Sequence, residues 1–163
     1  PASTAIFGSI EVAVERYLEA CNQHKNPAGR PMCSYFIHIA DNRSEEDFGR
    51  AALISYFQNC VLRAIPSDPT KIPKNMQYFI KLRENLGKAQ KSDLTSQSIL
   101  IGGAPEIIDR LKEVEATGIA EVILYFNVGN KPHGMVKDQM SKFMDEIAPH
   151  FVGKHQNLEK LAS

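Results

Sequence analysis

IGGAPEIIDRL at residues 101–111 and GIAEVILYFN at residues 118–127 describe a helix that leads into a strand. Pro105 suits the first turn of a helix, where its missing N–H is not needed, and apolar residues then recur at helical spacing. Gly118 is typical of a helix end, and the β-branched and aromatic residues after it predict a strand. A short strand or loop is also expected at residues 98–101. Strand, helix and strand in this order are the repeating unit of parallel α/β folds.

The preceding part of the chain repeats this alternation. Apolar spacing predicts a first helix over residues 10–21, and MCSYFIHIA at residues 32–40 predicts a strand that is buried on both faces. Ser44 with Asp47 has the spacing of a capping box, so we expect a long helix over residues 44–62. The sequence therefore predicts a mixed α/β chain with parallel strands.

The downstream segments complete a single domain over residues 1–163. Three prolines exclude regular helix at residues 66–73, and a weaker helix is expected to follow. Residues 66–97 are interpreted as a lid or insertion, because they come after a strand and helix of the sheet and are rich in loop signals. A last helix is expected to begin at Pro132, and residues 152–163 are interpreted as a polar tail.

The number of expected strands is too small for a closed sheet. Two or three parallel strands cannot close a barrel, for which roughly 250 residues are typical, and the chain has 163. The sequence also begins at Pro1 in a polar stretch, without a Met. We therefore expect the chain to be a fragment of a longer protein.

Composition and charge exclude several classes of function. The 19 basic and 19 acidic residues cancel, and the basic residues are scattered, so a nucleic-acid partner is not expected. No apolar run approaches the length of a membrane span, and the N-terminus is unlike a secretory signal. The spacing of Cys21, Cys33 and Cys60 predicts neither a metal site nor a disulfide framework, which favours a reducing, cytoplasmic location.

Residues 101–111 and 118–127 resemble the C-terminal signature of the bacterial luciferase-like monooxygenases. In that family a Gly-small-Pro-Glu turn begins a helix that runs through a short loop into the last barrel strand. Residues 132–151 look like the helix that closes the barrel, and the acidic residues 44–47 are similar to the start of the helix in the preceding unit. The resemblance implies an α/β fold made of the C-terminal βα units of a luciferase-like TIM (β/α)8 barrel, incomplete in this chain.

This resemblance implies a flavin-dependent monooxygenase, in which reduced FMN and O₂ oxidise a small organic substrate. A deazaflavin is the less favoured cofactor, and a flavin reductase is an expected partner. Ala104 departs from the family, which more often has Ser or Thr there to cap the helix. The missing βα units hold most of the flavin contacts in the family, so the fragment alone is expected to be inactive.

Two other interpretations stay open. The chain could be a non-catalytic remnant or interaction domain that covers its exposed strand edges by self-association or with a partner chain. It could also be an independent small α/β binding domain unrelated to the family, and internally covered strands would favour this.

Candidate site residues lie at helix starts and strand ends. Gly102 and Gly103 precede a helix N-terminus, where backbone N–H groups can hold a phosphate, although a bare Gly-Gly is more often a plain turn. His38 is a candidate proton carrier, but a hydrogen-bonded core histidine is the commoner role in such an apolar run.

Two further candidates follow the last predicted strand, with one more at the start of the last helix. Phe126 and Asn127 end that strand, where active sites of barrels lie, and Phe126 is a candidate for packing on a flavin ring if it is not simply core. His133 is close to the same loop but fits a surface residue equally well.

Overall fold

The computed structural model describes residues 10–94 and 99–151, so the predicted tail at residues 152–163 lies outside the described residues. The helices and strands alternate as predicted. In chain order they are α2 (Ile10–Gln23), β1 (Met32–Ile39), α3 (Arg43–Tyr56), η1 (Phe57–Val61), α4 (Leu62–Ala64), η2 (Pro69–Lys71), η3 (Lys74–Met76), α5 (Tyr78–Lys88), η4 (Lys91–Asp93), β2 (Leu100–Gly102), α6 (Ala104–Ala116), β3 (Glu121–Tyr125), α7 (His133–Lys142), η5 (Phe143–Ile147) and η6 (Ala148–His150).

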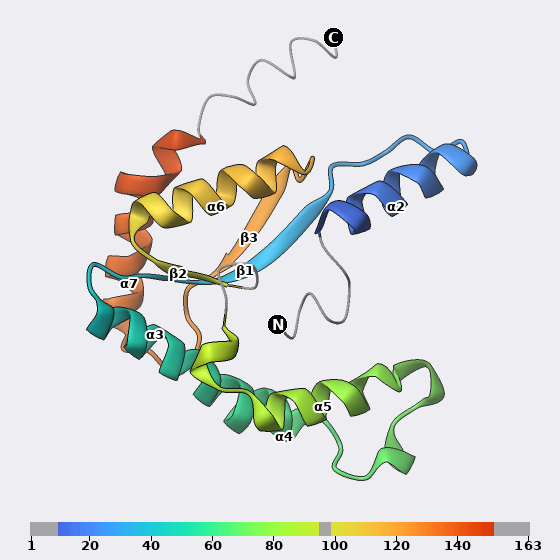
Figure 1. Cartoon of the computed structure of the whole chain (residues 1–163), viewed down its shortest axis with the longest axis horizontal. Coiled ribbons are helices and arrows are strands. Elements are labelled where there is room, and N and C mark those ends of the chain that lie inside the picture. Colours follow the sequence, from blue (N-terminus) through green and yellow to red (C-terminus); the bar gives the residue numbers. More distant parts are fainter. Residues whose placement is uncertain (1–9, 95–98, 152–163) are drawn as a thin grey trace.

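The described strands form one parallel sheet in the order β2-β1-β3 (Figure 1). Ile37 of β1 lies opposite Leu100 of β2, and Ser34 of β1 lies opposite Ile123 of β3. The prediction of an α/β fold with parallel strands is therefore confirmed. Successive strands of a (β/α)8 barrel are neighbours, so consecutive barrel units would place β2 in the centre. Here β1 is central, and this strand order departs from the order expected of barrel units.

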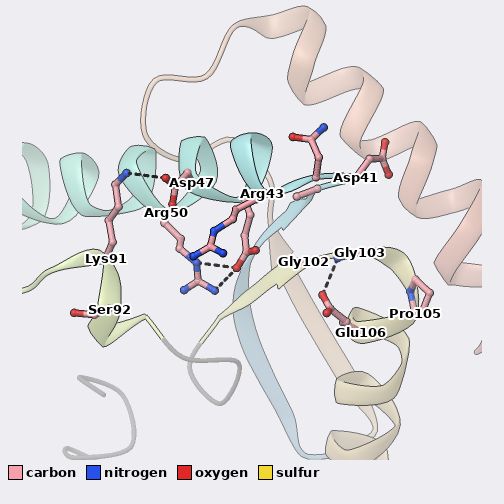
Figure 2. Close-up of a pocket in the computed structure, with 13 residues that line it drawn as sticks. Asp41, Arg43, Asp47, Arg50, Lys91, Ser92, Gly102, Gly103, Pro105 and Glu106 are labelled. Atoms are coloured by element: carbon pink, nitrogen blue, oxygen red, sulfur yellow. Dashed lines mark hydrogen bonds and ion pairs between the residues drawn. The ribbon is translucent and has the colours of Figure 1, made fainter.

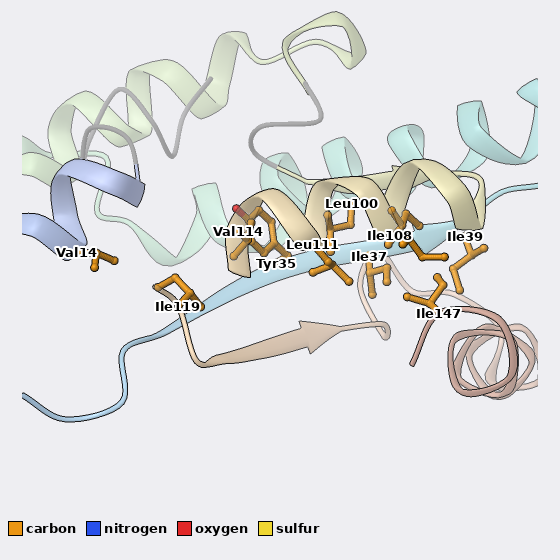
Figure 3. Packing of buried hydrophobic residues seen from close by; sticks show 11 residues of the cluster. Val14, Tyr35, Ile37, Ile39, Leu100, Ile108, Leu111, Val114, Ile119 and Ile147 are labelled. Atoms are coloured by element: carbon orange, nitrogen blue, oxygen red, sulfur yellow. The ribbon is translucent and has the colours of Figure 1, made fainter. Parts of the chain in front are cut away.

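Helices cover both faces of the sheet. On one face, apolar residues of α6, α2 and η5 pack with those of β1 and form the main core (Figure 3). α3 lies on the opposite face (Figure 1), where Leu53 packs with Ile99 and Val128. The helices that follow β1 and β2 therefore leave the sheet in opposite directions.

The sheet is buried unevenly along its length. Ile37 and Ile39, at the carboxyl end of β1, are almost fully buried. Toward the amino end of β1 one face is open: Met32 is 56% exposed, and Ile123, which lies opposite Ser34, is 46% exposed. The prediction that β1 is buried on both faces is therefore correct only for its second half, because no described helix covers the first half on that face.

Asn42, and not Ser44, caps α3. The Asn42 Oδ1 accepts hydrogen bonds from the backbone N–H groups of Ser44 and Glu45, both at 3.1 Å. The Glu45 carboxylate in turn accepts from the backbone N–H of Asp41 at 2.8 Å. The predicted capping box of Ser44 and Asp47 is therefore wrong. The reason is that Asn is at least as good a cap as Ser, and its position lets Glu45 complete the cap.

The described part of the predicted lid, residues 66–94, packs against the end of one long helix made of α3, η1 and α4. Ile65, Ile72 and Leu86 form a separate small core there. Arg83 of α5 fixes the segment by donating to the carbonyl oxygens of Leu62 and Ile65, both at 2.8 Å. In Figure 1, α4 and α5 lie side by side, away from the sheet. The segment is thus an attached unit with its own core, and its predicted role as a lid stays a prediction.

Candidate functional site

A crevice of about 750 Å³ lies at the carboxyl ends of β1 and β2 (Figure 2). The loop after β1 forms one wall with the start of α3, and the loop after β2 forms the other with the start of α6. η4 contributes the third side. The residues that line the crevice are Ala40, Asp41, Asn42, Arg43, Glu46, Asp47, Arg50, Lys91, Ser92, Gly102, Gly103, Pro105 and Glu106.

The position of the crevice follows from the topology. Because α3 and α6 leave the sheet toward opposite faces, the loops after β1 and β2 separate and leave space between them (Figure 1). Ligands of open α/β sheets bind outside the carboxyl ends of the strands, in crevices of this kind. The volume also falls within the range of small-molecule sites. The crevice is therefore the best candidate site among the described residues.

The equivalent space between the ends of β1 and β3 is closed by α7 and the loop before it. The side-chain amide of Gln139 donates to the carbonyl oxygen of Ile39 at 2.7 Å and accepts from the Ile39 N–H at 2.6 Å. Lys131 Nζ donates to the carbonyl oxygens of Ile37 and Phe126, at 3.3 and 3.1 Å. These side chains form hydrogen bonds with backbone groups that would otherwise be available to a ligand.

Gly102 and Gly103 line the crevice, as predicted for a phosphate-binding turn. Gly102 has a φ of +155°, a conformation that other residues rarely adopt. The N–H of Gly103 is already bonded, because the Glu106 Oε2 accepts it at 3.0 Å (Figure 2). Glu106 thus satisfies the N–H of Gly103, the residue before the helix, whereas no described side chain caps the N–H groups of the first turn of α6. A bound anion would have to displace this carboxylate from the helix N-terminus.

Most charges in the crevice are paired. Arg50 Nη2 lies 2.6 Å from the Glu46 carboxylate, and Lys91 Nζ lies 3.8 Å from that of Asp47. Arg43 forms no ion pair with any residue of the described ranges, and its guanidinium points into the crevice (Figure 2). The crevice therefore offers one available cation next to a helix N-terminus.

Arg43, Glu106 and Lys91 were missed by sequence reasoning. Each lies in an ordinary charged stretch, and only the fold brings these stretches together. One signal was present for Glu106, since Glu three residues after a Gly at a helix start is typical of a capping interaction.

His38 does not line the crevice. Its ring is 3% exposed and packs under Gly49 of α3, on the other side of the strand. Neither ring nitrogen has a hydrogen-bond partner among the described residues. Burial lowers the pKa of His38 to about 4, helped by the charge of Lys131 and opposed by the neighbouring Glu45. His38 is therefore a neutral core histidine at pH 7. Its burial agrees with the commoner interpretation of the sequence, but the hydrogen bond expected of it is not made within the described residues.

Lys131 was also missed. It is 9% exposed, and burial lowers the pKa of its amine to about 8. A small cavity lined by both His38 and Lys131 lies between them, under Gly49 and Val128. Its size matches at most a water molecule, so this cavity beside His38 and Lys131 is closed to substrates.

The remaining predicted residues are not brought to the crevice. Phe126 packs edge-on against Phe143, with ring centroids 5.7 Å apart, as part of the main core. Asn127 and His133 are exposed beyond β3. Gly102 and Gly103 are therefore the predicted site residues that the crevice contains.

No protein-family model, curated protein or solved structure matches the chain. Within the described ranges, no group of three or more His, Cys, Asp or Glu side chains is arranged to hold a metal ion. No described helix has the length and apolar character needed to cross a lipid bilayer.

Proposed function

We propose that the crevice binds the phosphate of a flavin cofactor, and that the chain is the C-terminal part of a flavin-dependent, luciferase-like monooxygenase. Reduced FMN is the proposed cofactor, with a deazaflavin as the alternative. The observation that carries the binding proposal is the unpaired Arg43, which points into a crevice of cofactor size beside the N-terminus of α6. The class of reaction rests on the resemblance of residues 101–127 to that family.

The crevice fits the anionic end of FMN better than its ring. Arg43 supplies a positive charge, and the N–H groups of Ala104 and Glu106 belong to the first turn of α6, where a helix has no acceptor of its own. No aromatic side chain is among the residues that line the crevice. Ring contacts would therefore come from parts of the protein outside the described residues.

The bound flavin would supply the oxidation chemistry, in which the reduced ring and O₂ oxygenate an organic substrate. The residues described here would do two things. Arg43 and the start of α6 would hold the phosphate, and η4 would cover it with Lys91 and Ser92. This arrangement orients the cofactor and contributes no proton-transfer group. A flavin reductase and a cytoplasmic location, where Cys21, Cys33 and Cys60 would stay reduced, belong to the same proposal.

The strand order β2-β1-β3 differs from the order in a barrel, so the fold does not by itself support flavin binding. The test therefore measures flavin binding directly. FMN and riboflavin differ only in the phosphate, and equilibrium dialysis, which does not depend on contacts to the ring, measures the binding of each to the full chain. A phosphate contact worth about 1.4 kcal/mol makes FMN bind about tenfold more tightly than riboflavin. Equal affinity for the two flavins, or no binding of either, would contradict the proposal.

Two substitutions in the crevice have opposite expected effects. Arg43→Gln removes the available cation and should abolish the preference for FMN. Glu106→Gln keeps a side chain that can cap the helix but removes the competing negative charge, so FMN should bind more tightly. Arg63→Gln is the matched control, because Arg63 is an exposed residue of α4 outside the crevice. It should leave both affinities unchanged.

The open face of the sheet favours a second candidate function, that of an interaction domain. Met32, Ile123 and Tyr125 expose large apolar side chains on the same face of the sheet, since Met32 lies opposite Glu121 and Ser34 lies opposite Ile123. Exposed apolar patches at a strand edge are typical of association sites. This function requires no flavin.

A further inference from the structure

The outer edge of β2 carries one backbone N–H and one C=O that face away from the sheet. The carbonyl oxygen of Gly102 accepts from the N–H of Ala40 at 2.9 Å, so the backbone of Gly102 points toward β1. In a strand, the N–H and C=O of one residue point to the same side, and successive residues alternate in direction. The N–H and C=O of Ile101 therefore point away from β1. Since β2 ends the sheet, they face no other described strand.

A groove of about 420 Å³ runs along this edge, and we call it the β2 groove. Ile99, Leu100 and Ile101 form its floor, α3 forms one wall and α6 forms the other. In Figure 1, β2 lies between these two helices. An occupant of the β2 groove is therefore held between the two helix layers and meets the outward backbone groups of Ile101.

The two walls of the β2 groove differ in charge. On the α3 wall one arginine and one glutamate form an ion pair at 2.6 Å, so this wall is neutral. The α6 wall has a single cation, Arg110, which lies 2.7 Å from the carboxylate of Glu113. The carboxylates on the α6 wall belong to Glu106, Asp109 and Glu113. Four carboxylates against two guanidinium groups leave the β2 groove with a net charge of −2, and the excess lies on the α6 wall.

We propose that the β2 groove binds an extended segment of another protein, in which one apolar residue lies between two basic residues. The segment adds a strand to β2 and places its apolar residue opposite Ile101, whose N–H and C=O it pairs with. Opposite residues of paired strands share a face. The apolar side chain therefore joins Ile101 on the α3 face, where Ile101 packs beside Leu53.

The alternation of a strand then decides where the basic residues go. The residues on either side of the apolar one point to the opposite face, which is the side of Leu100 and of the α6 wall. There they meet the excess carboxylates, including that of the exposed Asp109. An acidic segment would meet like charges at the same two positions. A small amine would match the charge but would leave the N–H and C=O of Ile101 without partners.

This inference goes beyond flavin binding. Neither Ile101 nor Asp109 lines the crevice that holds the proposed phosphate site. The experiments below change only these groups or the peptide, so failure of peptide binding and failure of flavin binding are distinguishable. The full chain is used in both.

A labelled peptide of sequence Ser-Lys-Val-Lys-Ser is the probe, and fluorescence anisotropy measures its binding to the full chain. The peptide Ser-Glu-Val-Glu-Ser should bind about tenfold more weakly or worse, because it places negative charges against the α6 wall. Salt should reduce the affinity of the lysine peptide, since the carboxylates are exposed. Equal binding of the two peptides, or no binding of the lysine peptide at about 1 mM, would overturn the proposal.

Methylation of single peptide nitrogens separates strand addition from attraction of charge alone. An antiparallel peptide donates to the carbonyl oxygen of Ile101 from the N–H of its Val, and a parallel peptide donates from the N–H of its second Lys. One of the two N-methylated peptides should therefore bind about tenfold more weakly, and which one it is identifies the orientation. Unchanged binding of both would overturn the proposal.

Hydrogen exchange locates the bound peptide on the chain. With saturating lysine peptide, the amide of Ile101 should exchange about tenfold more slowly, because it gains an acceptor. The amide of Leu100 points toward β1 and should change little. Exchange at Ile101 that does not slow would overturn the proposed position.

A reversal of charge on the α6 wall tests the basic residues of the partner. Asp109→Lys should weaken binding of the lysine peptide about fivefold or more and strengthen binding of the glutamate peptide. Asp138→Lys is the matched control, because Asp138 is an exposed acid of α7 that does not line the β2 groove. It should leave both affinities unchanged. A preference for the lysine peptide that is as large in Asp109→Lys as in the unchanged chain would overturn the proposal.

Discussion

Lowering the pH should destabilise the chain through His38. The folded state holds this histidine neutral, with a pKa of about 4 instead of the usual 6.5, because its ring is buried and lies near the positive charge of Lys131. In the unfolded chain the pKa of His38 returns to its usual value. Between pH 6.5 and pH 4 the unfolded state therefore binds more protons than the folded state, and stability falls as the pH falls.

The magnitude follows from the difference in pKa. Each unit is worth about 1.4 kcal/mol, so His38 alone would cost about 3 kcal/mol at pH 4 and about 2 kcal/mol between pH 7 and pH 5 if burial acted in full. Relaxation of the protein around a protonated His38 and entry of water reduce this cost. We therefore expect the free energy of unfolding to fall by about 1–2 kcal/mol between pH 7 and pH 5. Such a loss is a sizeable part of the stability of a domain.

Urea unfolding at pH 7 and pH 5 measures the effect, with three proteins compared. Between pH 7 and pH 5 the free energy of unfolding of the unchanged chain should fall by about 1–2 kcal/mol. In His38→Leu this contribution should be absent, because Leu does not titrate and fills a similar space. His133→Asn removes an exposed histidine and should behave like the unchanged chain. If His38→Leu shows the same pH dependence as the unchanged chain, the assignment of a buried neutral histidine is refuted.

Three further substitutions, one of them with a matched control, test the packing around the sheet. Gly49→Ala would place a Cβ 2.3 Å from the His38 ring and should cost about 1–3 kcal/mol in urea unfolding, whereas Gly134→Ala has open space and should not destabilise. Lys131→Met should remove the rise in stability between pH 8 and pH 10.5, a window in which the unfolded chain binds more protons than the folded one because burial lowers the pKa of Lys131 to about 8. Gln139→Leu leaves the N–H and C=O of buried Ile39 without these partners and should cost about 2–4 kcal/mol; loss of less than 1 kcal/mol would show that α7 is not held at β1 by this side chain.

Local patterns predicted the elements well because their causes are local. The helix stop at Gly118 depends on a left-handed residue, and the structure has a φ of +92° there. The cap of α3 was placed two residues late, since Asn42 and Ser44 are both good caps and the choice depends on how Glu45 folds back. Such choices are decided by a few tenths of a kcal/mol and are not visible in residue spacing.

The sheet order and the site were not predictable in the same way. A neighbour for β3 is chosen by the path of α6 across the sheet, and nothing in residues 118–127 alone distinguishes pairing with β1 from pairing with β2. The crevice could not be predicted for the same reason, because Arg43 and Gly103 line one crevice only when β1 and β2 are adjacent. Buried Lys131 shows the same limit, since its environment comes from strands distant in sequence.

The carboxyl ends of the strands offer two positions where the proposed cofactor could bind, one between β1 and β2 and one between β1 and β3. Doubly wound sheets of order 2-1-3 hold their ligand between strands 1 and 3, but Gln139 and Lys131 close that position here. The crevice between β1 and β2 is left open, with Glu106 on the helix N-terminus where an anion would bind. A ligand at this crevice has to displace one carboxylate, whereas a ligand between β1 and β3 would have to break several hydrogen bonds to buried backbone. Because the second cost is several-fold larger, an anionic ligand of this chain should bind at Arg43 and Gly103 and leave α7 in place.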